Sequence, residues 1–311
     1  MTRKDAIAAL NPDFLVPGVA RPLHVRGRLT LWLIRRFNKR KTSTRPGVTS
    51  ERKEIPGAHG LRVVVHRPDG REAPTGALLW IFGGGLISGS AEHVNDVAST
   101  FAAELGIVVV VPDYRLAPEH PYPAAIDDNF AALTWLAENV EDLGVDADRI
   151  IVGGESAGAG LAAALAQRAR DAGISLRLQV MIAPMLDDRS VIRAEENGEY
   201  YLLWTVPSNR YAWMRYLGHA PGEEEVRPYA VPARREDLRG LAPAWISVGE
   251  SDHFYAEAVD YARRLSEAGV RAEICTIPGA HHGWELLTPE HPEVLRVQSE
   301  RLAAMRSALW D

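Results

Sequence analysis

The stretch Gly154-Glu155-Ser156-Ala157-Gly158 decides the fold, because it stands between a strand-like and a helix-like segment. It follows the apolar run Ile150-Ile151-Val152 and precedes an alanine-rich run from Leu161 to Ala169. A serine on a sharp strand-to-helix turn needs small neighbours, because the backbone there passes close to other chain segments. The two glycines provide that room, and the turn pushes the serine hydroxyl out of the sheet. The stretch therefore predicts a nucleophile; the alternative is a glycine-rich turn with a capping serine.

Strand-like and helix-like segments alternate from about residue 75 to 280. The run Ile107–Val111 is wholly β-branched, which is typical of a strand covered on both faces. The expected strands are 76–81, 107–111, 149–153, 178–182, 245–248 and 273–277, and the expected helices are 94–105, 123–140, 157–172, 254–268 and 292–310. This alternation predicts an α/β fold with a mostly parallel central sheet flanked by helices. Ligands then bind at the carboxyl ends of the strands.

Two segments stand outside this alternation, namely residues 1 to about 45 and about 186 to 233. The second is rich in tyrosine, tryptophan, proline and charge, which indicates an insertion over the sheet. We therefore expect N-terminal cap helices in residues 1–45. We expect a catalytic domain in residues 46–311, with a cap insertion at about 186–233.

The N-terminal segment contains a basic amphipathic helix. Its residues Leu29, Trp32, Leu33 and Phe37 fall on one helical face, and no acidic residue occurs from Arg21 to Lys41. A basic amphipathic helix can lie on an anionic membrane. We favour the other interpretation, in which the helix covers an active site and its charges are solvated.

Bulk composition limits the classes of function. The chain has 311 residues, of which 46% are hydrophobic and 24% charged, so it can bury a large core. Its net charge of −6 argues against a general nucleic-acid surface. A single cysteine, Cys275, rules out an intrachain disulfide and fits a reducing compartment. No apolar run approaches the roughly 18 residues that a membrane span needs. We expect a cytoplasmic protein without stable membrane insertion.

A serine hydroxyl needs a base to take its proton, and that base is usually histidine. Four histidines follow the serine as candidates: His219, His253, His281 and His282. The last two come directly after the final expected strand, at the same edge as the serine. We prefer His282, because the adjacent Gly283 permits a tight approach, and His281 is the alternative. The pair could also be exposed turn residues or an incidental metal site.

The acid that orients the histidine should also follow a strand. Asp252 does so in Gly249-Glu250-Ser251-Asp252, one strand before the histidine loop. There it can hold the imidazole in the right tautomer and stabilise its charged form. The alternatives are Glu250, Asp187 and Asp188.

Donors for a developing oxyanion are expected in Gly83-Gly84-Gly85, directly after the strand that ends near Ile81. Consecutive glycines expose their N–H groups without side chains in the way. The N–H of Ala157, in the first turn of the helix after Ser156, can join them.

These motifs together resemble the hormone-sensitive-lipase-like (bacterial family IV) carboxylesterases of the α/β-hydrolase superfamily. The likeness covers about residues 77–285 and rests on the glycine loop Gly83–Gly85, the segment Asp113-Tyr114-Arg115-Leu116-Ala117-Pro118-Glu119, the serine turn, Asp252 with Glu257, and Pro278-Gly279-Ala280-His281-His282-Gly283.

The resemblance implies an α/β-hydrolase fold with a helical cap. It implies a serine carboxylesterase that hydrolyses short- to medium-chain acyl esters through an acyl-enzyme, with no cofactor and no metal. It assigns catalysis to Ser156, Asp252 and His282, and the oxyanion hole to Gly84, Gly85 and Ala157. Dimers are common in the family, so a homodimer is possible.

One departure concerns Phe82, which stands where the family usually has a histidine that braces the glycine loop. Phenylalanine cannot donate those hydrogen bonds, so we predict that Phe82→His changes turnover more than stability. An alternative function is a non-catalytic small-molecule-binding protein on the same fold, although such proteins usually lose a triad member. A dinucleotide site at Gly158-Ala159-Gly160-Leu161-Ala162-Ala163 is the weakest alternative, because the helix has already begun there.

Overall fold

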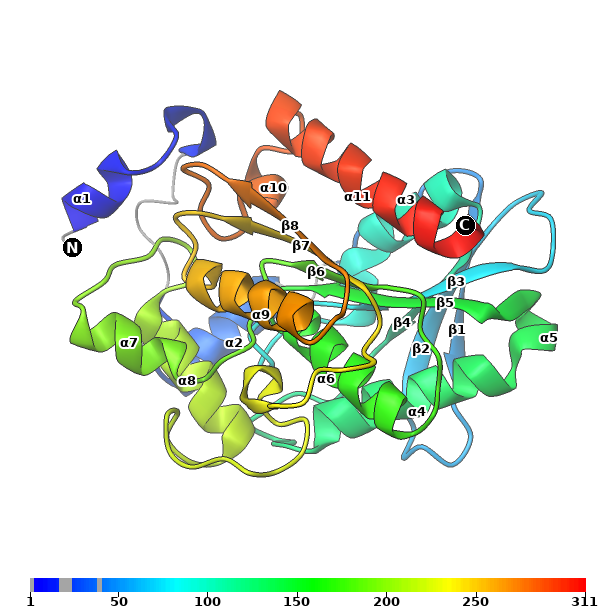
Figure 1. The fold of residues 1–311 in the computed structure, drawn as a ribbon, viewed down its shortest axis with the longest axis horizontal. Coiled ribbons are helices and arrows are strands. Elements are labelled where there is room, and N and C mark those ends of the chain that lie inside the picture. The colour runs from blue at the N-terminus through cyan, green and yellow to red at the C-terminus, as the bar shows by residue number, and fades with distance from the viewer. Residues whose placement is uncertain (1–2, 17–23, 38–40) are drawn as a thin grey trace.

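A single sheet of eight strands runs through the computed structural model, which describes residues 3–16, 24–37 and 41–311 (Figure 1). The strands are β1 (Val48–Glu54), β2 (Arg62–Pro68), β3 (Thr75–Ile81), β4 (Val108–Pro112), β5 (Val145–Glu155), β6 (Gln179–Ile182), β7 (Ala244–Gly249) and β8 (Ala272–Ile277). Their order in the sheet is β1-β2-β4-β3-β5-β6-β7-β8. Strand β2 pairs antiparallel with β1 and β4, whereas all other neighbours are parallel. The expected mostly parallel sheet is confirmed.

Helices cover both faces of this sheet, as Figure 1 shows. Helices α3 and α11 lie on one face, and α4, α6 and α9 lie on the other. Their bounds are α3 (Asn95–Leu105), α4 (Ala124–Glu138), α5 (Val140–Leu143), α6 (Ala157–Asp171), α9 (Tyr255–Glu267), α10 (Trp284–Leu287) and α11 (Pro292–Trp310). The central strand β3 is buried along its whole length, which is why it reads as a continuous apolar run rather than an alternating one.

The two segments outside the alternation meet over the end of the sheet where α6 begins (Figure 1). They contain α1 (Arg3–Ala8), α2 (Arg28–Phe37), α7 (Ser190–Glu196), α8 (Val206–Leu217) and short 3₁₀ turns at Pro12–Phe14 and Pro232–Arg234. Leu10 and Leu202 pack together in a small apolar cluster of their own. The Val25 amide donates to the Ser208 hydroxyl of α8 at 2.9 Å. The N-terminal segment and the insertion are therefore in direct contact.

Helix α2 packs through a different face from the apolar one seen in the sequence. Leu31 is buried and Ile34 packs against the core, whereas Leu29 and Trp32 are 72% and 59% exposed. Arg35 lies on the packed side, where its guanidinium reaches backbone carbonyls of the catalytic domain. Of the basic stretch, Arg21, Lys39, Arg40 and the side chain of Phe37 lie outside the described residues.

The turn between β5 and α6 is held by a very close backbone approach. Ser156 adopts φ 54° and ψ −120°, and its amide donates to the carbonyl of Ile182 at 2.8 Å. A Cβ on Gly158 would lie only 2.1 Å from the carbonyl oxygen of Ile81 at the end of β3. The glycine is therefore required so that α6 can begin directly beside β3.

No helix among the residues described here is long and apolar enough to cross a membrane.

Replacing Gly158 with alanine should lower the free energy of unfolding by more than about 2 kcal/mol, because the new methyl group overlaps a fixed backbone oxygen. In an unobstructed helix the same change would stabilise the protein. Gly27→Ala is the matched control, since nothing lies within 4 Å of its Cβ position. Urea unfolding of both variants measures the difference, and equal midpoints would contradict this account of the turn.

His66 in β2 should make the fold sensitive to acid. Its side chain is buried, Nδ1 lies 2.7 Å from the Ser50 hydroxyl, and Nε2 has no hydrogen-bond partner among the described residues. Burial lowers the pKa of His66 from about 6.5 to about 4. Between these two pH values the imidazole of the unfolded chain is protonated and that of the folded chain is not. The neutral imidazole therefore contributes fully to the free energy of unfolding above about pH 6.5, and this contribution is lost as the pH falls toward 4.

Between pH 7.5 and 5, wild type should lose about 2 kcal/mol more unfolding free energy than His66→Gln. The control His59→Gln, at an exposed histidine, should lose as much as wild type. Urea titrations at both pH values give the numbers. The same acid loss in His66→Gln as in wild type would show that the imidazole is already charged when folded.

Candidate active site

The serine, histidine and carboxylate expected from the sequence lie in one row of hydrogen bonds. The Ser156 hydroxyl donates to Nε2 of His282 across 3.0 Å, and Nδ1 of His282 donates to Oδ2 of Asp252 across 2.8 Å. The other oxygen of Asp252 accepts from the Phe254 amide at 2.9 Å, and the Phe254 ring stands edge-on to the imidazole. Asp252 is buried, so little water competes for its carboxylate. This arrangement can move a proton from the hydroxyl to the imidazole.

The sheet explains how residues 126 positions apart become neighbours. Ser156 follows β5, Asp252 follows β7 and His282 follows β8. These strands are parallel, so their carboxyl ends lie at the same edge of the sheet. Strand order therefore brings the three side chains together, since each lies within a few residues of the end of its strand.

The other candidate histidines have different partners. The ring nitrogens of His281 lie 2.7 Å from the His282 carbonyl and 3.0 Å from the Phe14 carbonyl. His281 therefore joins the N-terminal segment to the histidine loop and does not face the serine. His219 bonds to Glu225 in the insertion, and His253 bonds to Asn209 of α8.

The rival carboxylates are engaged elsewhere. Asp187 pairs with Arg189 and Arg193, and Asp188 is held by Arg234. Glu250 is exposed and reaches Thr276 at 3.5 Å. None of these three acids hydrogen-bonds to His282, so Asp252 is the carboxylate that the fold presents to the imidazole.

The glycine loop lies against the serine turn. A Cβ on Gly83 would lie 3.3 Å from the Cβ of Ser156. Within the described residues, nothing accepts a hydrogen bond from the N–H groups of Gly84 or Gly85. Ala157 is the first residue of α6, where an N–H has no intrahelical acceptor. Among the described residues, the glycine loop and the start of α6 thus offer three N–H groups without an acceptor.

The loop is fixed without the histidine that usually precedes it. Phe82 is buried and stacks on Tyr114 with ring centroids 4.2 Å apart. The Tyr114 hydroxyl donates to the carbonyl of Phe82 at 2.9 Å. The carbonyl of Gly84 accepts from the Ser88 amide and hydroxyl at 3.0 and 2.9 Å. Packing and these bonds therefore supply the bracing.

Two charged side chains tie the loop to its surroundings. The guanidinium of Arg35 donates to the carbonyls of Ile87 and Ala117 and pairs with Glu119. The hydrogen bond from Arg35 lowers the pKa of Glu119 to about 2. Glu155 accepts from the Gly83 amide, while its burial raises its pKa. Sequence patterns did not reveal the role of Arg35, because its partners are more than 50 residues away.

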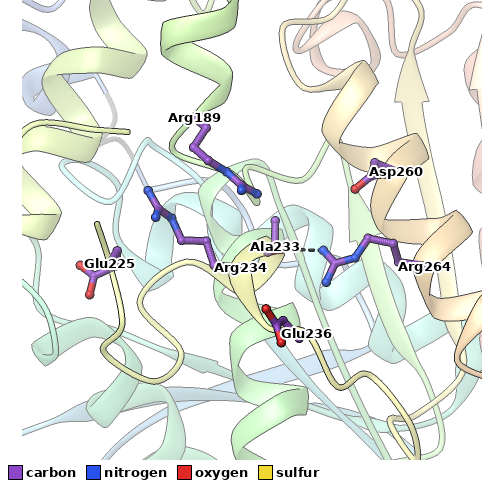
Figure 2. A pocket seen from close by; sticks show the side chains of 7 residues that line it. All are labelled: Arg189, Glu225, Ala233, Arg234, Glu236, Asp260 and Arg264. Atoms are coloured by element: carbon purple, nitrogen blue, oxygen red, sulfur yellow. Dashed lines mark hydrogen bonds between the residues drawn. The ribbon is translucent and has the colours of Figure 1, made fainter. Parts of the chain in front are cut away.

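The lining of a hollow of about 420 Å³, drawn in Figure 2, includes no residue of the serine row or of the glycine loop. It is lined by Arg189, Glu225, Ala233, Arg234, Glu236, Asp260 and Arg264. Its arginines are all partnered: Arg189 by Asp187, Arg234 by Asp188, and Arg264 by the Ala233 carbonyl. The described part of the chain also contains no group of three or more metal-ligating side chains. The row of hydrogen bonds at Ser156, in contrast, can pass a proton from a hydroxyl to an imidazole.

A serine, a histidine and an aspartate joined in this way at strand ends, beside a glycine loop, are typical of serine hydrolases with the α/β-hydrolase fold. Comparison with known proteins leads to the same class. Residues 78–286 match the protein family described as alpha/beta hydrolase fold.

Named relatives narrow the class further. The chain is 35% identical to carboxylesterase NlhH of Mycobacterium tuberculosis over 75% of its own length and 73% of that protein. It is 34% identical to ethyl acetate hydrolase of Pseudomonas putida over 72% and 71% of the two chains. The solved structure named Bacterial Heroin Esterase superposes with a TM-score of 0.86, at 34% identity, over 98% and 99% of the chains. The chain belongs to the hormone-sensitive-lipase-like family of α/β hydrolases, and it is a carboxylic ester hydrolase.

Tyr114→Phe should lower kcat about tenfold with little change in KM, because the loop that carries Gly84 and Gly85 loses the bond at Phe82. The ring stack remains, so stability should fall by only about 1 kcal/mol. Steady-state kinetics and thermal melting measure the two effects.

Tyr261→Phe is the matched control for that variant. It also removes a buried tyrosine hydroxyl, here 3.2 Å from Gln167, but far from the glycine loop. It should lose similar stability and keep its kcat. An equal fall of kcat in both variants would show that Tyr114 acts only through general stability.

Proposed function

We propose that this chain is a serine carboxylesterase in which Ser156 is the nucleophile, His282 the base and Asp252 the residue that orients it. The Oγ of Ser156 attacks the ester carbonyl carbon while its proton passes to Nε2 of His282. The tetrahedral intermediate then expels the alcohol, which takes that proton, and leaves an acyl-enzyme. Water, deprotonated by His282, releases the acid and restores the serine. The observation that carries the proposal is the unbroken row of hydrogen bonds from hydroxyl to carboxylate.

The N–H groups of Gly84, Gly85 and Ala157 are proposed as the oxyanion hole. Three observations support this role: these N–H groups lack acceptors in the described chain, Ala157 directly follows Ser156, and Gly83, which precedes the other two donors, lies against the serine. Donors held in place before the reaction stabilise the oxyanion without reorganising, and losing one typically costs about a hundredfold to a thousandfold in rate.

The cap is proposed to consist of residues 1–45 and about 186–233, above the catalytic domain of residues 46–311. Contacts between Leu10 and Leu202 and between Val25 and Ser208 support a joint role. Short- to medium-chain acyl esters are the proposed substrates, in keeping with a relative named for ethyl acetate hydrolysis. A cytoplasmic location and a homodimer belong to the same proposal; the single cysteine favours the former.

Ser156→Ala should reduce kcat/KM for p-nitrophenyl acetate and butyrate by at least about a thousandfold, because it removes the hydroxyl that bonds to Nε2 of His282. A fluorophosphonate probe should label the wild type and leave this variant unlabelled. Equal hydrolysis by both proteins would refute Ser156 as the nucleophile, whereas a wild type that neither hydrolyses the esters nor is labelled would favour the non-catalytic binding protein.

The paired histidines provide a matched comparison within the same experiment. His282→Asn should lose activity as Ser156→Ala does, since the base is gone. His281→Asn keeps the base and removes the imidazole contacts with the Phe14 and His282 carbonyls, neither of which involves Ser156, so most of the turnover should remain. The reverse order of activities would exchange the roles of the two residues.

A further inference from the structure

The insertion places one aromatic side chain directly on the glycine loop. Trp204 lies between α7 and α8 and is half-buried. A methyl group on Gly85 would lie 2.2 Å from the Cη2 atom of its indole. The adjacent Leu203 reaches over Gly283 on the other side, where a Cβ would lie 2.6 Å from its Cδ2. The pair 203–204 therefore crosses the site from the glycine loop to the histidine loop.

Asn209 of α8 holds that indole in place. Nε1 of Trp204 donates to Oδ1 of Asn209 at 3.1 Å. Nδ2 of Asn209 lies 2.8 Å from Nε2 of His253, and 3.5 Å from the Ser190 hydroxyl. Asn209 has no exposed surface, and a buried amide must satisfy both its donors and its acceptor.

Only one assignment of donors and acceptors fits the row of contacts from Trp204 through Asn209 to His253. An indole N–H can only donate, so Oδ1 of Asn209 must accept and its Nδ2 must donate. Nε2 of His253 must then accept, which requires a neutral imidazole. Burial lowers the pKa of His253 to about 4, in agreement with that requirement. His253 directly follows Asp252, so the row joins the indole to the loop that carries the proposed acid.

We propose that Trp204 determines substrate specificity by limiting the size of the group that lies over Gly85, and that Asn209 is the positioning residue that keeps the indole there. The inference rests on the proposed esterase function. The indole is a flat, rigid wall on one side of the expected reaction centre. Released from Asn209 it could rotate away, and bulkier esters would then fit. Sequence spacing gives no sign of this, because Asn209 and His253 are 44 positions apart.

The test measures kcat/KM for two ester series in wild type, Trp204→Ala, Asn209→Ala and the double variant. One series lengthens the acyl group on p-nitrophenol, and the other enlarges the alcohol of acetate esters from ethyl to phenyl to 1-naphthyl. In at least one of the two series, Trp204→Ala should raise the ratio of kcat/KM for the bulkiest ester to kcat/KM for the smallest at least about tenfold. Asn209→Ala should shift it in the same direction by about threefold or more, and the double variant no further than Trp204→Ala. Trp310→Ala, near the C-terminus, is the matched control and should keep the wild-type ratio.

The positioning role would be overturned if Asn209→Ala lowered kcat/KM by the same factor for every ester, and if that loss added to the effect of Trp204→Ala in the double variant. Should Asn209→Ala fail to fold, Trp204→Phe breaks the same bond from the other side and should shift the ratio less than Trp204→Ala. The indole N–H resonance of Trp204, identified by its loss in Trp204→Phe, should move in Asn209→Ala and stay in Trp310→Ala. An unmoved resonance refutes the bond whether or not the protein is an esterase, whereas inactivity of wild type on all esters refutes the proposed function.

Discussion

The structure depends on how closely the start of α6 approaches the end of β3. At that point the position of a Cβ on Gly158 is 2.1 Å from the Ile81 carbonyl oxygen, so only glycine fits. The approach puts the glycine loop after β3 beside the serine turn after β5. Two parts of one reaction centre, separated by about 70 residues, thus share one packing constraint. The histidine and the acid then arrive through strand order alone.

The N-terminal segment is hydrogen-bonded to the loop that carries His281 and His282. The Asn11 amide donates to the Gly279 carbonyl, and His281 lies 3.0 Å from the Phe14 carbonyl. Phe14 also packs against Trp284, directly after the histidine loop. The N-terminal segment therefore stabilises the loop that presents His282, while the insertion covers the glycine loop from the other side. Access to the site and the geometry of the site are coupled in this way.

The central sheet and the meeting of the site residues could be predicted from the sequence, whereas the edge strands and the contacts between distant elements could not. The meeting of Ser156, His282 and Asp252 could be predicted from strand ends, because parallel strands bring their carboxyl termini to one edge. Strands β1 and β2 were not predicted: β1 is mostly exposed and charged, so it lacks the apolar run that marks a central strand. The packed face of α2 was not the one expected, because Arg35 belongs to it and its partners lie in the catalytic domain. Contacts such as Asn209 with His253 join different elements and leave no periodic trace in the chain.

Arg35 has a consequence for how such proteins diversify. One guanidinium joins a helix of the N-terminal segment to two backbone carbonyls and to Glu119, all of which lie outside that segment. A chimera whose N-terminal helix has no arginine at this position would keep the proposed catalytic groups and lose these bonds. Glu119 and both carbonyls lie outside the helix, so a graft that carries the arginine can form the whole set again.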